Sequence, residues 1–204
     1  MLYPVKEGTI IEYKDFDAKD KLTGSSIQTI SKVVEDGSNL TVGIDFQGFD
    51  KKGENLLNGN FEVRCIDGTF YMDMKNMLDA AALSAYKEME VEVNSNDLAY
   101  PSNMSAGTKL PDADITVGIS SGGVKMFTMT VYITNRLVDA IESVTTPAGT
   151  FECFKTSFDM ETKMMIKIQA KATQWIAEDV GMVRTENYNK KGKLQGYTIL
   201  SEIN

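Results

Sequence analysis

The stretch that decides the fold class is Lys163-Met164-Met165-Ile166-Lys167-Ile168-Gln169-Ala170-Lys171-Ala172-Thr173, in which every second position from Met164 to Ala172 is apolar. Side chains two residues apart in a β-strand point to the same face, so this pattern predicts one face on a core and one in water. A helix, with 3.6 residues per turn, could not present that alternation. We therefore expect a strand over residues 162–177.

The same period of two recurs along the chain, for example in 40–46, 115–119 and 127–133. Short polar turns rich in Asp, Asn, Lys and Gly separate these segments, as at 16–22, 49–54 and 188–194, and they favour antiparallel hairpins. We expect strands near 9–16, 25–35, 39–49, 60–66, 69–74, 88–94, 113–119, 124–136, 137–145, 151–160, 162–177, 181–188 and 194–202. The predicted fold is mainly β, a single domain over residues 1–204 whose antiparallel meander forms an open or closed barrel-like sheet.

Two segments depart from this pattern. Between Asn76 and Met89, apolar residues recur at helical spacing, which predicts one short α-helix near 76–89 whose apolar stripe packs on the sheet. Residues 94–114 are richer in Ser, Asn, Pro and Gly, and we expect a long loop there.

Composition excludes several classes of function. The chain has 204 residues, a formal net charge of −8 and no histidine. The negative charge repels nucleic acid, and the lack of histidine removes imidazole metal ligands and histidine-based catalysis. No motif for a metal, a cofactor or a catalytic nucleophile is present, and no segment is long and apolar enough to span a membrane as a helix. We expect a protein that is not an enzyme and uses no cofactor.

The two cysteines, Cys65 and Cys153, lie far apart in the sequence and could form at most one disulfide. Cys65 alternates with Phe61 and Val63, which is typical of a small buried side chain on a strand. We expect both thiols to be reduced.

The chain contains 12 methionines, most of them in or beside the predicted strands. Methionine adapts to irregular volumes, so these residues either fill a core or line a deformable apolar surface. If the sheet is concave, we expect an uncharged or acyl-bearing ligand, such as a lipid, to contact Phe127, Met129, Val131, Met164, Ile166 and Ile168. Trp175 lies on the opposite parity, and we expect it at the rim of this surface, beneath the helix or beneath the 94–114 loop. The alternative is a structural or protein-protein interaction module without a cavity, whose partner would be another protein of the cell envelope.

Several segments together resemble a domain-of-unknown-function family of exported bacterial proteins. They are 3–9 with Glu12-Tyr13, the turn 21–24, the hairpin 146–153 and the segment 175–184. The resemblance implies a YmcC-like, antiparallel, barrel-like fold and an exported protein, periplasmic or associated with the outer membrane. A half-barrel closed by a helix is also, more distantly, similar to periplasmic lipoprotein carriers. These motifs consist of turn glycines, strand aromatics and a tryptophan, and they imply no activity.

Overall fold

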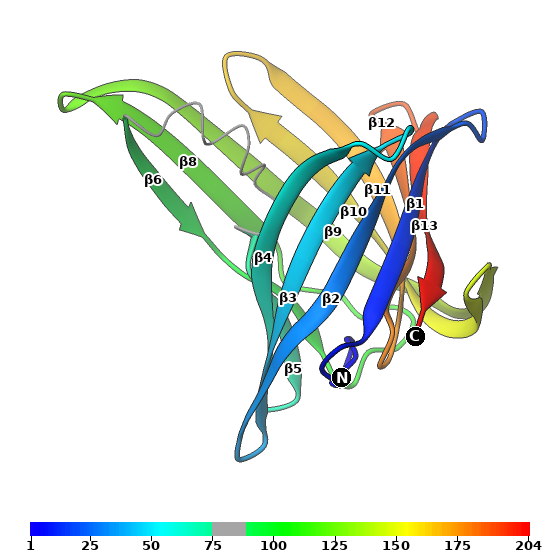
Figure 1. Ribbon diagram of the computed structural model, residues 1–204. Coiled ribbons are helices and arrows are strands. Elements are labelled where there is room, and N and C mark those ends of the chain that lie inside the picture. Colours follow the sequence, from blue (N-terminus) through cyan, green and yellow to red (C-terminus); the bar gives the residue numbers. More distant parts are fainter. Residues whose placement is uncertain (75–88) are drawn as a thin grey trace.

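The computed structural model describes residues 1–74 and 89–204, and it places 13 strands in one antiparallel sheet (Figure 1). The strands are β1 Ile10–Asp17, β2 Leu22–Asp36, β3 Asn39–Asp50, β4 Asn55–Ile66, β5 Thr69–Met72, β6 Glu90–Ser95, β7 Leu98–Pro101, β8 Ala113–Ser121, β9 Val124–Thr146, β10 Gly149–Lys163, β11 Lys167–Ala177, β12 Gly181–Asn189 and β13 Leu194–Ile203. The prediction of a mainly β, antiparallel fold is confirmed.

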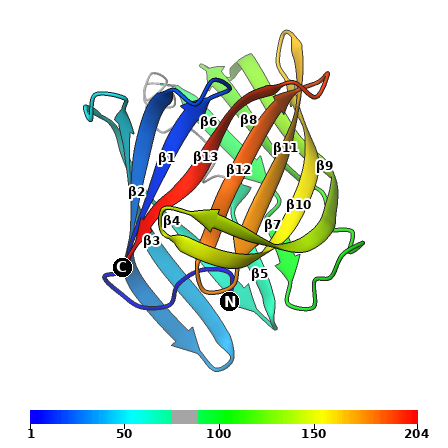
Figure 2. The same ribbon diagram turned by 90° about the vertical axis from the view of Figure 1, so that its right-hand side faces the viewer.

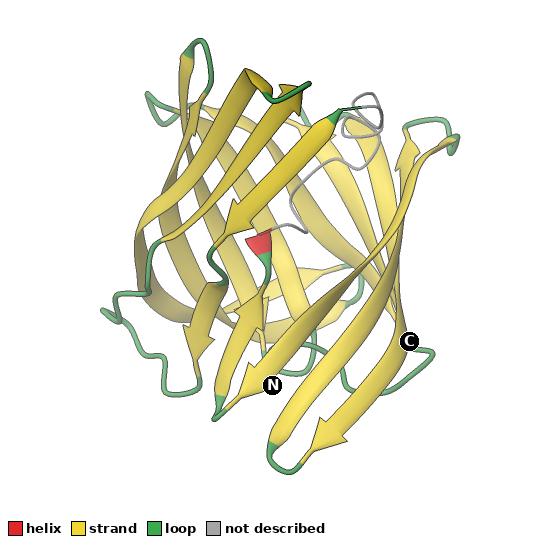
Figure 3. Ribbon diagram, turned by 90° about the vertical axis from the view of Figure 1, so that its left-hand side faces the viewer, coloured by secondary structure: helices red, strands yellow, loops and turns green. Residues whose placement is uncertain are grey.

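The order across the sheet is β6-β8-β9-β10-β11-β12-β13-β1-β2-β3-β4-β5-β7. The sheet is open, with β6 and β7 as its edges, so the closed form of the predicted barrel-like sheet is wrong. Only Asn96 and Asp97 join β6 to β7. Three residue steps span at most about 11 Å, so the sheet must curl until its edges meet at this end, as Figure 3 shows.

Two side-chain contacts hold this junction. Arg64 on β4 pairs with Asp97 at 2.5 Å, and the Ser95 hydroxyl donates to Asp73 at 3.0 Å. Both contacts join the β6–β7 connection to β4 and to the residue after β5, which lie beside the β7 edge of the sheet. The curled sheet therefore has a concave inner face and a convex outer face.

The main core lies on the concave face and follows the predicted alternation. Ile11 and Tyr13 on β1, Val42 and Ile44 on β3, and Leu200 on β13 are buried almost completely. On β8, the buried residues are Ala113, Ile115, Val117 and Ile119, while the residues between them are partly exposed. The hydrophobic effect of burying these side chains is the main stabilising contribution to such a sheet.

A second, smaller core lies on the convex face. The end of the β9–β10 hairpin folds back across the outer side of the sheet (Figure 2). Its Cys153 packs with Trp175 and Ala177 of β11 and with Val183 of β12. A bulge in β12, where Trp175 pairs with Arg184 and Ile176 with Met182, leaves Val183 as the extra residue.

Three sequence predictions need correction. The strands expected at 124–136 and 137–145 form one 23-residue strand, β9, in which Asn135 has a φ of 55° beside a register shift. The expected loop at 94–114 contains β7 and the ends of β6 and β8. The strand expected at 162–177 begins only at Lys167, because Met164–Ile166 form the turn of the β10–β11 hairpin. The helix predicted near 76–89 falls, except for Met89, on residues outside those described.

Candidate ligand cavity

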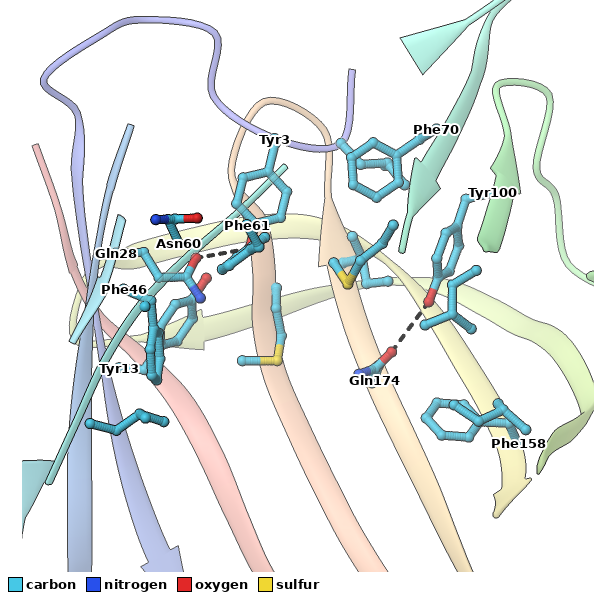
Figure 4. A pocket seen from close by; sticks show the side chains of 18 of the residues that line it. Tyr3, Tyr13, Gln28, Phe46, Asn60, Phe61, Phe70, Tyr100, Phe158 and Gln174 are labelled. Carbon is cyan, nitrogen blue, oxygen red and sulfur yellow. Dashed lines mark hydrogen bonds between the residues drawn. The ribbon is translucent and has the colours of Figure 1, made fainter. Parts of the chain in front are cut away.

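A cavity of about 610 Å³ lies against the concave face of the sheet (Figure 4). Seven aromatic side chains from the N-terminal segment and six strands line it: Tyr3, Tyr13, Phe46, Phe61, Phe70, Tyr100 and Phe158. Apolar residues such as Leu98, Ile133 and Ile176 fill the spaces between them. The volume lies within the range of pockets that bind small organic ligands.

Tyr3 brings the segment before β1 against the cavity. Its hydroxyl donates to the Gln28 side-chain oxygen at 2.8 Å, and its ring stacks on Phe70 with centroids 6.0 Å apart. Gly181, with a φ of 94°, lies beneath the ring, where an added Cβ would come within 3.4 Å of it. A glycine at this turn therefore allows both the left-handed backbone and the close approach of Tyr3.

Tyr13 on β1 is 1% exposed, and its hydroxyl has no hydrogen-bond partner among residues 1–74 and 89–204. It lies close to the Tyr3 hydroxyl, but the two do not meet in hydrogen-bonding geometry. A buried hydroxyl without a partner lowers the free energy of unfolding, so core packing alone does not account for a tyrosine at this position.

Tyr100 on β7 forms the opposite side of the cavity. Its hydroxyl donates to Gln174 on β11 at 3.5 Å, and the Arg136 guanidinium lies over its ring at 4.6 Å. Arg136 is 3% exposed and also donates to the backbone oxygens of Pro111, at 2.6 Å, and Ala99, at 3.2 Å. This buried arginine fixes the edge strand β7 and with it the position of Tyr100.

The described lining carries no group that is ionised near neutral pH. Its polar side chains are the amides of Gln28, Asn58, Asn60 and Gln174 and the phenols of the tyrosines. Burial raises the pKa of Tyr3 and of Tyr13 above the ordinary value of 10.0, so both stay neutral. The cavity is suited to holding an uncharged, mainly apolar group.

Gly59 marks free space in the wall. It pairs directly with Phe46, so a side chain at this position would point to the face that carries Phe46 and the cavity. A Cβ added at Gly59 would meet no atom within 4 Å. The cavity can therefore be filled from this position without displacing the backbone.

The residues expected to bind a ligand lie elsewhere. Trp175 is not at a rim but on the convex face, where it is 7% exposed and packs under the β9–β10 hairpin. Phe127, Met129 and Val131 are partly buried and pack against the main core, outside the cavity lining. Met164, Ile166 and Ile168 lie at the β10–β11 hairpin tip and are 49%, 74% and 59% exposed.

Sequence reasoning missed the aromatic residues that line the cavity. Tyr3, Tyr13 and Phe61 lie far from Tyr100 and Phe158 in the chain, and only the curl of the sheet brings them together. One signal was available, because Tyr3 and Tyr13 belong to the opening segment that carries the family resemblance.

Both thiols are free; Cys65 is half-buried and Cys153 is buried in the convex-face core. Among residues 1–74 and 89–204, no group of three acidic or cysteine side chains could hold a metal ion. The described residues contain no helix of the length and apolarity that crossing a membrane requires.

Two solved structures are similar to this chain over almost its whole length. One is the crystal structure of a Bacteroides fragilis protein with a YmcC-like fold, which is inferred to be exported. It is 27% identical to this chain with a TM-score of 0.80, and the match covers 99% of this chain and 98% of that one. The other is the crystal structure of a Parabacteroides distasonis protein that is inferred to be a lipoprotein. It is 27% identical to this chain with a TM-score of 0.82, and the match covers 100% of this chain and 98% of that one. Both likenesses support an exported, envelope setting. No curated protein matches the chain. Residues 6–200 match the DUF3108-like family model, and the chain belongs to that family.

Proposed function

We propose that this protein binds an apolar or acyl-bearing ligand in the concave-face cavity, without chemical turnover, in the periplasm or at the outer membrane. The observation that carries the proposal is the cavity of about 610 Å³ with seven aromatic residues and no ionised group in its described lining. The likeness to proteins described as exported and as a lipoprotein supports the cellular setting.

The energetics favour such a ligand. Burying apolar surface contributes ~25 cal/mol per Å², or about 0.8 kcal/mol per methylene. The aromatic walls can supply that contact, while the Gln28 and Gln174 amides can orient one polar group of the ligand. Because the driving force is burial and not charge, binding should persist at high salt.

An experiment on one glycine tests the proposal. N-phenyl-1-naphthylamine, an uncharged fluorescent probe, is titrated into the wild-type protein and into the Gly59→Leu variant. Leucine at this position points into free cavity space, so the probe's affinity should fall about tenfold or more, as loss of part of the buried apolar area predicts.

Gly118→Leu is the matched control. Gly118 lies on β8 between the buried residues Val117 and Ile119, so its side chain would point to the opposite face, and a Cβ there also meets no atom within 4 Å. This variant should bind the probe like the wild type. Equal binding by Gly59→Leu and wild type, or no binding by the wild type, would favour the alternative of an envelope interaction module.

A further inference from the structure

Five hairpin turns lie at the same end of the sheet. Because neighbouring strands are antiparallel, the β1–β2, β3–β4, β8–β9, β10–β11 and β12–β13 turns all lie at one end, at the top of Figure 1. Most of these turns are polar, as at Asp17–Lys21 and Asn189–Lys193, where an Asp or Asn side chain accepts backbone hydrogen bonds.

The β10–β11 tip, Met164–Ile166, differs from the others in being entirely apolar. Met165 is 94% exposed and Ile166 is 74% exposed, and the next inward-facing residue, Ile168, is 59% exposed. Single exposed apolar residues are common, but a run of them at the end of a hairpin is a feature of surfaces that meet an apolar phase or partner.

The tip also projects past β12, whereas β9 on its other side continues beyond Thr130, the partner of Lys163, to Val124. The last pair between β11 and β12 is Ala170 with Asn189, so Lys167, Ile168 and Gln169 extend beyond β12. Three residues of strand add roughly 10 Å. On the β12 side, the tip therefore extends ahead of the last residues of β12.

Positive charge surrounds the apolar tip. Lys163 and Lys167 flank it and share one carboxylate, Glu161, at 3.7 and 2.6 Å. The neighbouring β12–β13 turn carries Lys190, Lys191 and Lys193, which are exposed and form no ion pair with the described residues. This local excess of positive charge contrasts with the net charge of −8 for the whole chain. An apolar tip within a lysine cluster is complementary to an anionic lipid surface, where each basic residue contributes about 1 kcal/mol.

An apolar strip connects the tip with the cavity. The β10–β11 register has no shift from Phe154↔Ile176 to Lys163↔Lys167, so Ile168, Ala170 and Ala172 share the face of Gln174 and Ile176. The last two line the cavity. This continuity favours a lipid surface over a protein partner, because acyl chains match both ends of the strip.

We infer that the β10–β11 tip docks the protein on an anionic lipid bilayer, with Met165 and Ile166 inserted at the interface and the flanking lysines against the headgroups. The inference goes beyond the proposed cavity ligand; the preference for a lipid over a protein partner rests in part on that proposed function, whereas the exposed apolar tip and its lysines do not.

Vesicle flotation of the purified protein tests this docking. We expect binding to phosphatidylcholine vesicles that contain phosphatidylglycerol and weaker binding to phosphatidylcholine alone. The Met165→Asp/Ile166→Asp double variant should lower the partition coefficient about tenfold or more, since it removes the inserted apolar surface and adds negative charge. Lys190→Glu/Lys191→Glu should weaken binding to the anionic vesicles about tenfold or more and leave binding to phosphatidylcholine alone unchanged.

Val34→Asp is the matched control, because Val34 is 42% exposed near the β2–β3 turn, at the opposite end of the sheet. It should bind vesicles like the wild type. Wild-type protein that fails to float, or tip variants that float equally well, would overturn the inference. A wild-type dimer in sedimentation analysis that becomes a monomer in the tip variant would also overturn the inference, because the tip would then bind a second copy of the chain and not a bilayer. The tip variant should still bind N-phenyl-1-naphthylamine like the wild type, which would show that its loss of flotation does not result from a damaged cavity.

Discussion

The indole Nε1 of Trp175 donates a hydrogen bond of 2.7 Å to Glu142 Oε1, joining β11 to the part of β9 that folds over the convex face. Lys155 on β10 completes the contact, with its Nζ 3.2 Å from the same carboxylate and 5.2 Å from the centre of the indole ring. The three residues lie on three adjacent strands and hold the hairpin against the sheet. Charge-assisted hydrogen bonds of this kind are stronger than neutral ones.

The first prediction concerns the pH dependence of this contact. The hydrogen bonds from Trp175 and then from Lys155 lower the pKa of Glu142 from its ordinary value of 4.5. A carboxyl whose pKa is lowered by folding adds stability above its ordinary pKa, and this is lost as the pH falls through the folded pKa. Trp175 is the only tryptophan, so its fluorescence should change in a transition with a midpoint below pH 4.5.

Glu142→Gln should remove that fluorescence transition. Glu161→Gln is the control, since hydrogen bonds from Lys167 and Gln169 also lower the pKa of Glu161, but these partners lie at the hairpin tip and not beside the indole. A transition that persists in Glu142→Gln would show that another group controls the indole.

The sequence correctly predicted the two faces of β11, because local alternation depends only on strand geometry. Ala172 faces the core and Lys171 faces out, as the pattern indicates. The pattern could not predict that Trp175, on the polar side, is buried under a hairpin. That burial depends on the bend and bulges of the 23-residue β9, which are long-range properties of the twisted sheet.

The candidate site was harder to predict for a related reason. Alternation identifies inward-facing residues but not where the inner face leaves the core, so Ile166 and Ile168 were expected in a ligand site yet lie at an exposed tip. Phe61 and Phe158 come from opposite halves of the chain and line one cavity only because the sheet curls. Loop composition likewise concealed β7, whose Tyr100 is held by a contact with Arg136 across the fold.

The second prediction concerns the thiols. Burial, and then the nearby Glu142 charge, raises the pKa of Cys153 to about 11, so little of its reactive thiolate exists at neutral pH. Cys65 is only half-buried. Iodoacetamide should therefore add one label to the native protein at Cys65, and a second at Cys153 only in denaturant.

Intact mass with peptide mapping measures both labels. Cys65→Ser should remove the fast label and leave the slow one. Equal labelling rates in the native state, or a native mass lower by the two hydrogens of a disulfide, would contradict the structure.

The third prediction concerns Gly196, where β13 passes close to β1. A Cβ at this position would lie 2.6 Å from the backbone oxygen of Phe16, which cannot move without disturbing the strand pair. Overpacking of this kind costs typically 1–3 kcal/mol, and each kcal/mol lowers the melting temperature of a chain this size by about 2–4 °C. Gly196→Ala should therefore melt several degrees below the wild type.

Gly118→Ala provides the comparison, because a Cβ at Gly118 meets nothing within 4 Å. Calorimetry should show no loss of stability for this variant, since alanine restricts the unfolded chain more than glycine does. Similar melting temperatures for the two variants would mean that β1 and β13 approach less closely than described.

The last prediction concerns the Tyr13 hydroxyl, which is buried beside the cavity without a hydrogen-bond partner in the described part of the chain. Leaving a buried hydroxyl unsatisfied costs about 1–3 kcal/mol, and phenylalanine keeps the ring while removing that group. Tyr13→Phe should therefore raise the free energy of unfolding by about 1 kcal/mol, after allowance for the small gap that it leaves. Urea denaturation measures this as a higher midpoint with an unchanged m-value.

Tyr3→Phe is the comparison and should lower the free energy of unfolding, because it removes the 2.8 Å hydrogen bond to Gln28 and leaves the amide oxygen without its donor. If Tyr13→Phe lowers the free energy of unfolding as much as Tyr3→Phe does, the prediction is wrong. The Tyr13 hydroxyl would then have a hydrogen-bond partner in solution.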